Sequence, residues 1–105
     1  MKPVRITVVH RALHENLFAA HDTQETDVKG SPCPYFETGQ SFEAHDTSMP
    51  EGFCPVAWGM LFADIRMIRM GANPPWMTHA GQTITCCRDG LRPVSFLVER
   101  IGETT

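Results

Sequence analysis

The sequence predicts a small α+β domain, in which a mostly antiparallel sheet of about four strands packs against one principal helix over residues 55–70. Apolar residues alternate with polar ones near both ends of the chain, which is the period of a half-buried strand. In the middle of the chain they recur instead at helical spacing. The chain has 105 residues, of which 42% are hydrophobic, so we expect one core and a single domain over 1–105.

The N-terminal half contains two expected strands. Alternation predicts one strand over 3–10, and a short run after a glycine predicts a second over 40–44. Between them, residues 11–22 carry apolar side chains at helical spacing and are expected to form a short helix, while the polar residues 23–31 indicate a loop. The Pro-Cys-Pro sequence at 32–34 predicts extended backbone outside a sheet interior, because each proline lacks an N–H donor.

The principal helix has recognisable start and stop signals. Pro55 suits the first helical position, where a missing N–H costs nothing, so Cys54 becomes the expected N-cap residue. Arg66 and Arg69 fall in the expected last turn, where they complement the helix dipole, and Gly71 can end the helix. The apolar residues at helical spacing are Ala57, Leu61, Ile65 and Ile68.

The C-terminal third is expected to form a hairpin. Residues 82–87 predict one strand and residues 94–101 predict the returning strand. Asp89-Gly90 between them is a sequence that favours a tight hairpin turn.

The charge balance limits the classes of partner. Twelve acidic and nine basic side chains give a formal charge of −3, whereas surfaces that bind nucleic acid or anionic membranes need a basic excess. No apolar run approaches the roughly 20 residues of a membrane helix. The first residues lack the apolar block of a secretory signal. We therefore expect a cytoplasmic protein with neither a nucleic-acid nor a membrane partner.

The four cysteines are the most informative residues for function. A cytoplasmic protein is not expected to hold disulfides, which leaves metal binding, thiol chemistry or plain burial. Cys33 lies between two prolines and Cys54 precedes one, so stiff backbone fixes the position of both. A thiol at a helix N-terminus is favoured as the thiolate, the form that binds metals and attacks electrophiles. The alternative is that Cys54 is a small buried apolar residue.

Cys86 and Cys87 are neighbours on an expected strand, where adjacent side chains point to opposite faces. Only one of them would then join the other two cysteines. A two-residue loop at Asp89-Gly90 would place Cys87 opposite Arg92 and turn Cys86 to the other face. Because a bulge before the turn could bring both sulfurs to the same side, a three-cysteine site and a four-cysteine site both stay open.

Three functions fit these features. The first, preferred by a small margin, is metal binding through Cys33, Cys54, Cys86 and Cys87. Sulfur ligands indicate zinc or an iron–sulfur cluster.

The second function is that of a small cofactor-independent enzyme. Its small-molecule substrate, for example one from specialised metabolism, would bind in a pocket near Cys54, with Cys54 as the nucleophile and His10 or Asp64 as the base. The third is a non-catalytic binding module with buried structural cysteines. Because the principal helix is apolar over much of its surface, we also expect part of that surface either to meet a second subunit, in a homo-oligomer, or to line a pocket.

Two motifs connect the cysteines to other proteins. The first is GFCPxAW at residues 52–58, and the second is CCxDGLRPVxF at residues 86–96. Both resemble a family of small prokaryotic proteins that has no assigned function. The resemblance implies that the cysteine-bearing segments belong to one shared framework, and it implies no particular reaction.

Overall fold

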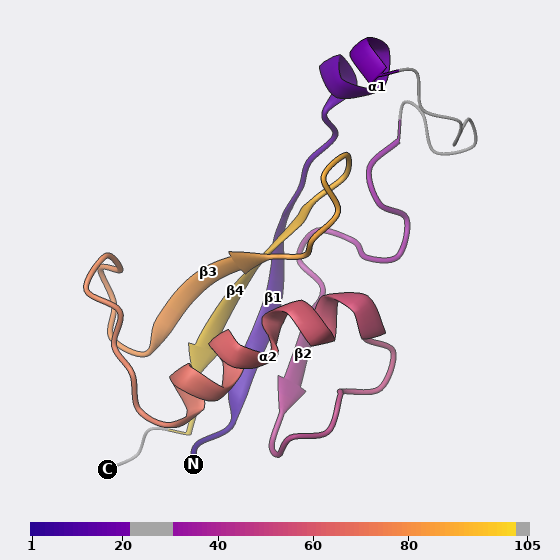
Figure 1. Ribbon diagram of the computed structural model, residues 1–105. Coiled ribbons are helices and arrows are strands. Elements are labelled where there is room, and N and C mark those ends of the chain that lie inside the picture. Colours follow the sequence, from indigo (N-terminus) through magenta and orange to yellow (C-terminus); the bar gives the residue numbers. More distant parts are fainter. Residues whose placement is uncertain (22–30, 103–105) are drawn as a thin grey trace.

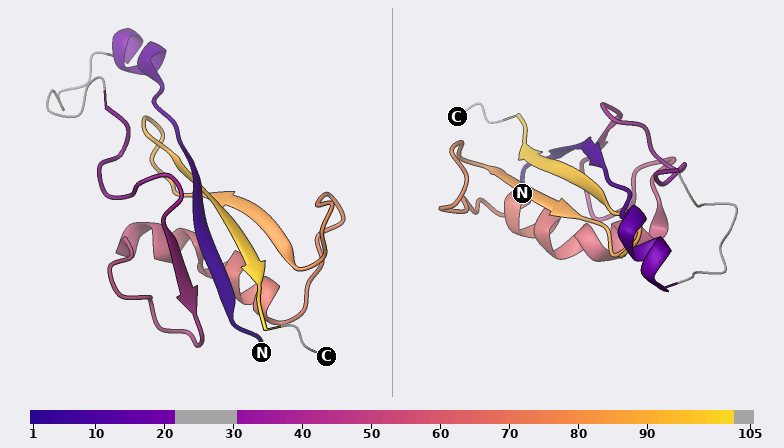
Figure 2. Two further views of the ribbon diagram at one scale, coloured as in Figure 1. Left: turned by 180° about the vertical axis from the view of Figure 1, so that it is seen from behind. Right: turned by 90° about the horizontal axis from the view of Figure 1, so that it is seen from above.

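The computed structural model describes residues 1–21 and 31–102. One four-stranded antiparallel sheet, in the order β2-β1-β4-β3, carries the helix α2 on one face (Figure 1). The view from above in Figure 2 shows the sheet and α2 as two layers. This confirms the predicted α+β class, and the loop expected over 23–31 falls almost entirely outside the described residues. The elements are β1 (Val4–Arg11), α1 (Glu15–His21), β2 (Ser41–Ala44), α2 (Pro55–Arg69), β3 (Gln82–Cys86) and β4 (Val94–Arg100).

The two central strands, β1 and β4, supply the sheet's share of the core. Their alternate side chains point toward α2 and are completely buried, which is the reason for the period of two in the sequence. The pairing shifts by one residue between Val8 and His10, so the end of β1 leaves the regular ladder. The inward-facing residues of the two strands are Val4, Ile6, Val8, Val94, Phe96 and Val98.

Helix α2 begins and ends where the sequence indicates. Cys54 is the N-cap residue and Pro55 occupies the first turn. At the other end Met70 is the C-cap residue, and Gly71 has a φ of 108°, a left-handed conformation that glycine adopts at low cost. The buried stripe of the helix consists of Ala57, Leu61, Ile65, Ile68 and Arg69.

An aromatic cluster joins the segment before α2 to the sheet. Phe53 is 1% exposed and lies at its centre. Its ring centroid is within 4.9–5.9 Å of four other rings, in tilted or edge-to-face arrangements that aromatic pairs prefer. Because Phe53 precedes Cys54, this cluster fixes the start of α2. The four surrounding rings are Phe36, Phe42, Trp58 and Phe96.

The hairpin between β3 and β4 differs from the prediction. Cys86 pairs with Ser95, and the Cys87 N–H donates to the Val94 carbonyl at 3.0 Å, so the expected pairing of Cys87 with Arg92 is wrong. The physical reason is the Asp89 side chain. Its Oδ1 accepts the backbone N–H groups of Leu91 and Arg92, both at 2.9 Å. These two hydrogen bonds stabilise a wider loop in place of a two-residue turn.

Candidate functional site

One pocket of about 330 Å³ lies beside the N-terminal end of α2 and contains three of the four cysteines. This volume is at the lower end of the range for small-molecule sites. Segments from before α2, from its first turn and from the β3–β4 loop form the walls, so the pocket exists only in the folded chain. We call it the cysteine pocket. It is lined by Cys33, Phe36, Cys54, Val56, Ala57, Cys87, Arg88, Asp89 and Val94.

Cys54 lies where helix α2 opens onto the pocket. Its backbone is extended, and its side chain makes no capping hydrogen bond to the helix. The Cys54 carbonyl accepts the Trp58 N–H at 2.8 Å, so the residue is tied to the first helical turn. Pro55 has no N–H, and the N–H groups of Val56 and Ala57 have no acceptor within the helix by geometry. The thiol therefore shares the pocket with the positive end of a helix dipole.

Cys33 is held by a hydrogen bond and by packing. Arg11 at the end of β1 donates from Nη1 to the Cys33 carbonyl at 3.1 Å. Three residues later, Phe36 is 2% exposed and anchors the same segment in the aromatic cluster. Cys33 also packs against the hydrophobic core. A hydrogen bond to Cys33 and the packing of Phe36 thus hold the stiff Pro-Cys-Pro segment in place.

Cys86 and Cys87 point to opposite sides of the sheet. The Cys87 sulfur accepts the Val94 N–H at 3.3 Å and packs against the core on the side of α2. Cys86 is exposed, together with Ile84, on the face away from α2, and it does not line the pocket. Three of the four predicted site cysteines are therefore brought together. The prediction that Cys86 and Cys87 point to opposite faces is confirmed although the predicted pairing of Cys87 with Arg92 is wrong, because Cys87 lies on the same face as Val94.

The predicted metal site would need several ligand side chains close enough together to bind one ion. Within residues 1–21 and 31–102, no set of three or more His, Cys, Asp or Glu side chains is arranged to hold a metal ion. All four cysteines are free thiols in the structure. The three pocket cysteines thus share one cavity without forming a preassembled ligand set.

The two residues expected as bases lie elsewhere. His10 is exposed at the end of β1 and does not line the cysteine pocket. Asp64 lies on α2 and accepts a hydrogen bond from the Thr85 hydroxyl at 2.8 Å, which ties the helix to β3. The acid that does line the pocket is Asp89, which the sequence indicates only as a turn residue.

Sequence reasoning missed the charged residues of the pocket. Arg88 is exposed and lines it next to Asp89. Their adjacency to Cys87 was the available signal, but a turn residue and the charged residue beside it need no role in a site. The wider loop brings them to the cysteines.

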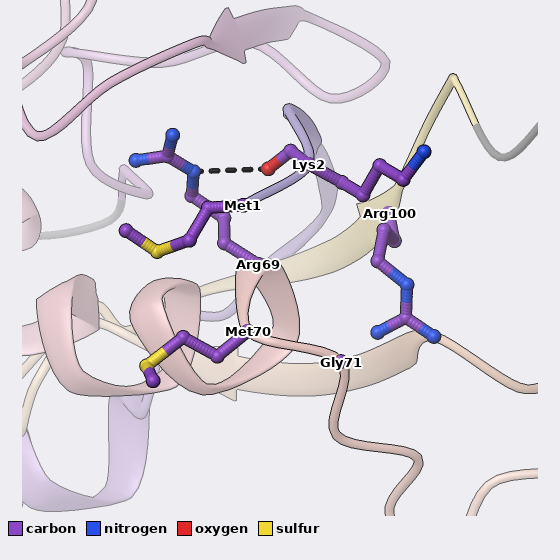
Figure 3. Close-up of a pocket in the computed structure, with 6 residues that line it drawn as sticks. All are labelled: Met1, Lys2, Arg69, Met70, Gly71 and Arg100. Atoms are coloured by element: carbon purple, nitrogen blue, oxygen red, sulfur yellow. Dashed lines mark hydrogen bonds between the residues drawn. The ribbon is translucent and has the colours of Figure 1, made fainter.

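A second hollow, of about 400 Å³, lies at the other end of α2 and contains no cysteine (Figure 3). Its arginines are engaged with backbone carbonyls. Arg69 donates to the carbonyls of Lys2 at 3.0 Å and His45 at 2.7 Å, and Arg100 donates to those of Ile68 at 2.7 Å and Ala72 at 2.9 Å. These cations stabilise the negative end of the helix dipole and tie it to the sheet, which is a structural role.

Comparisons with models of protein families, with curated proteins and with solved structures gave no match for this chain. Among the helices that the structure describes, none is long and apolar enough to cross a membrane.

Proposed function

We propose that the protein binds a small electrophilic molecule in the cysteine pocket and reacts with it through Cys54. The observation that carries this proposal is the position of Cys54, the N-cap residue of α2, which lines a cavity of ligand size. This is the enzyme-like alternative of the sequence analysis, with the cysteine as nucleophile and without His10 or Asp64 as base.

The chemistry follows from the helix terminus. The positive end of the α2 dipole stabilises an anionic sulfur, and the thiol proton goes to water. The sulfur then donates an electron pair to an electrophilic carbon of the ligand, so that a C–S bond forms. The pair displaced from that carbon goes to its leaving group or its carbonyl oxygen. Val56 and Ala57 line the pocket, and their backbone N–H groups, which have no acceptor within the helix, are donors for an anion there.

Alkylation by iodoacetamide at neutral pH tests this proposal. We expect native Cys54 to react roughly ten-fold faster than the same residue in urea-unfolded protein, because folding places its sulfur beside the positive helix terminus and in a pocket that holds the reagent. Val56 is 58% exposed and lines the pocket, so Val56→Trp should obstruct the cavity and slow the reaction with little cost to folding. Native reaction at or below the unfolded rate would overturn the proposal.

Metal binding is the second candidate, and the shared cavity of three thiols favours it. Thiolates are the preferred ligands of zinc and of iron–sulfur clusters, and Cys33, Cys54 and Cys87 would have to turn toward one another to hold either. Elemental analysis of protein purified without oxygen tests it. About one equivalent of metal, lost in Cys54→Ser and kept in Cys86→Ser, would support a metal site. Metal-free, stably folded protein would eliminate it.

Compartment and assembly belong to the same proposal. Four free thiols fit the reducing environment of the cytoplasm. Val56 and Met60, 58% and 47% exposed, form an apolar surface on α2 beside the pocket, and this surface supports a homo-oligomer. Light scattering after size exclusion should give a mass that falls to 11.8 kDa in Met60→Glu. A monomeric wild type at high concentration would contradict the oligomer.

A further inference from the structure

We propose that the ligand of the cysteine pocket carries a carboxylate, which the guanidinium groups of Arg11, Arg88 and Arg92 recognise. This inference rests on the proposed function and names the chemical class of its ligand. It follows from buried guanidinium nitrogens that lack a partner among the described residues, from the local balance of charge, and from the backbone pairing between the segments that carry Arg11 and Arg92.

The first observation is a pair of buried nitrogens without partners. Arg11 uses Nη1 to bind the carbonyl of Cys33, yet its Nε is buried and makes no hydrogen bond within the part of the chain that the structure describes. Arg92 places Nε 3.7 Å from Asp89 Oδ2, and its Nη1 is likewise buried without a partner there. Both arginines therefore touch residues that line the pocket. Buried unpaired donors are rare in native proteins, and a ligand in the pocket would supply the acceptor if these side chains rotate toward it.

The second observation is the charge around the pocket. Arg88 and Asp89 line it directly, and Arg11 and Arg92 adjoin it. The Asp89 carboxylate is already engaged, because Oδ1 accepts two backbone N–H groups and Oδ2 faces Arg92. Three guanidinium groups thus lie in or next to the pocket, whereas the one carboxylate that lines it, Asp89, already has hydrogen-bond partners. This local positive excess stands out in a chain whose formal charge is −3.

The third observation is the backbone that holds Arg11 and Arg92 together. Arg11 pairs with Val94 in the sheet, and just beyond it the Ala12 N–H donates to the Pro93 carbonyl at 2.9 Å. The segments that carry the two arginines therefore run side by side. An anion bound where these two segments meet would be attracted by both positive charges. Guanidinium groups bind carboxylates in a bidentate manner, which suits a small acidic ligand better than a neutral one.

Iodoacetate and iodoacetamide form a matched pair of probes for this inference. In both cases the Cys54 sulfur attacks the CH₂ carbon, a C–S bond forms, the C–I bond breaks and iodide leaves with the electron pair. The probes differ in that one carries a carboxylate and the other a neutral amide. The ratio of the two alkylation rates does not depend on the fraction of Cys54 that is ionised, because both probes react with the same sulfur. The measurement uses full-length protein in which Cys54 is the only cysteine.

We expect the iodoacetate-to-iodoacetamide ratio to be about ten-fold higher in native than in urea-unfolded protein, the lower end of the range for focused positive charge. Arg11→Gln and Arg92→Gln should return the ratio toward the unfolded value. Because those two arginines are partly buried, Arg88→Gln at an exposed position supplies a variant that keeps its fold. Arg66→Gln, exposed on the far turns of α2, is the matched control and should leave the ratio unchanged.

The two proposals fail in distinguishable ways. Fast reaction with iodoacetamide together with an unchanged ratio would overturn the carboxylate inference and leave the reactive thiol in place. Slow reaction with both probes would overturn the reactive thiol as well. A raised ratio that no variant at Arg11, Arg88 or Arg92 reduces would also overturn the inference, because the charge would then come from elsewhere.

Discussion

Replacement of Phe53 by alanine tests the packing that positions the candidate site. Phe53 is 1% exposed and its ring centroid lies 4.9–5.9 Å from four other rings. Truncation of a buried phenylalanine to alanine removes its burial and leaves a cavity, which together cost about 3–5 kcal/mol. A domain of this size has a free energy of unfolding of about 5–15 kcal/mol, so the variant should fold but lose a large share of its stability.

Urea unfolding followed by tryptophan fluorescence measures this change. With a slope of about 2 kcal/mol per molar urea, the midpoint should fall by roughly 2 M. Phe53→Leu keeps most of the volume and loses the ring pairs, so it should cost about 1–2 kcal/mol. Trp76→Ala is the control, because Trp76 is 71% exposed and should change the stability by no more than about 0.5 kcal/mol. A cost below about 1 kcal/mol for Phe53→Ala, with an unchanged slope, would refute the central position of this ring.

Three further predictions concern other parts of the fold. Thr85→Val removes the 2.8 Å hydrogen bond to Asp64 and should lower the free energy of unfolding by about 1–2 kcal/mol, and a double-mutant cycle with Asp64→Ala should show the coupling. Arg69→Met leaves two carbonyls without their charged donor and should cost roughly 2–4 kcal/mol in thermal unfolding, whereas a loss near zero would contradict its structural role. The backbone N–H of Ser48, 2.7 Å from the Asp46 carboxylate, holds the pKa of Asp46 below its usual 3.8. The folded state therefore favours the charged form, and the stabilisation is present above pH 3.8 and lost as the pH falls through the lower folded pKa. In Asp46→Asn the free energy of unfolding should therefore fall less between about pH 5 and about pH 2 than in the wild type. An identical dependence on pH in both proteins would contradict the lowered pKa of Asp46.

Much of the fold was predictable because local patterns and tertiary packing agree. The alternation in β1 and β4 survives in the structure as fully buried inward-facing side chains. The start of α2 was predictable because proline restricts where a helix can begin, so Pro55 places Cys54 at the N-cap.

The site was predictable only in part. Cys33, Cys54 and Cys87 were among the candidates, but the separation of Cys86 from them depends on which face of the sheet each side chain takes. The register of the hairpin depends on two backbone hydrogen bonds that the Asp89 carboxylate accepts. The general preference of Asp-Gly for tight turns does not reveal these bonds. Sheet pairing brings the segment of Arg11 next to the segment that follows Arg92, and nothing in the sequence around either arginine indicates this.

The most direct test of the central claim compares Cys54 with Cys86 in the same native sample. Mass spectrometry after brief exposure to limiting iodoacetamide gives the labelled fraction of each cysteine. Cys86 is exposed and serves as an internal standard, whereas Cys54 is half-buried beside the helix terminus. If the cysteine pocket activates its thiol, Cys54 is labelled first despite its lower exposure. If labelling follows exposure, with Cys86 first and Cys54 protected, the pocket cysteines are packing residues and the proposed function is wrong.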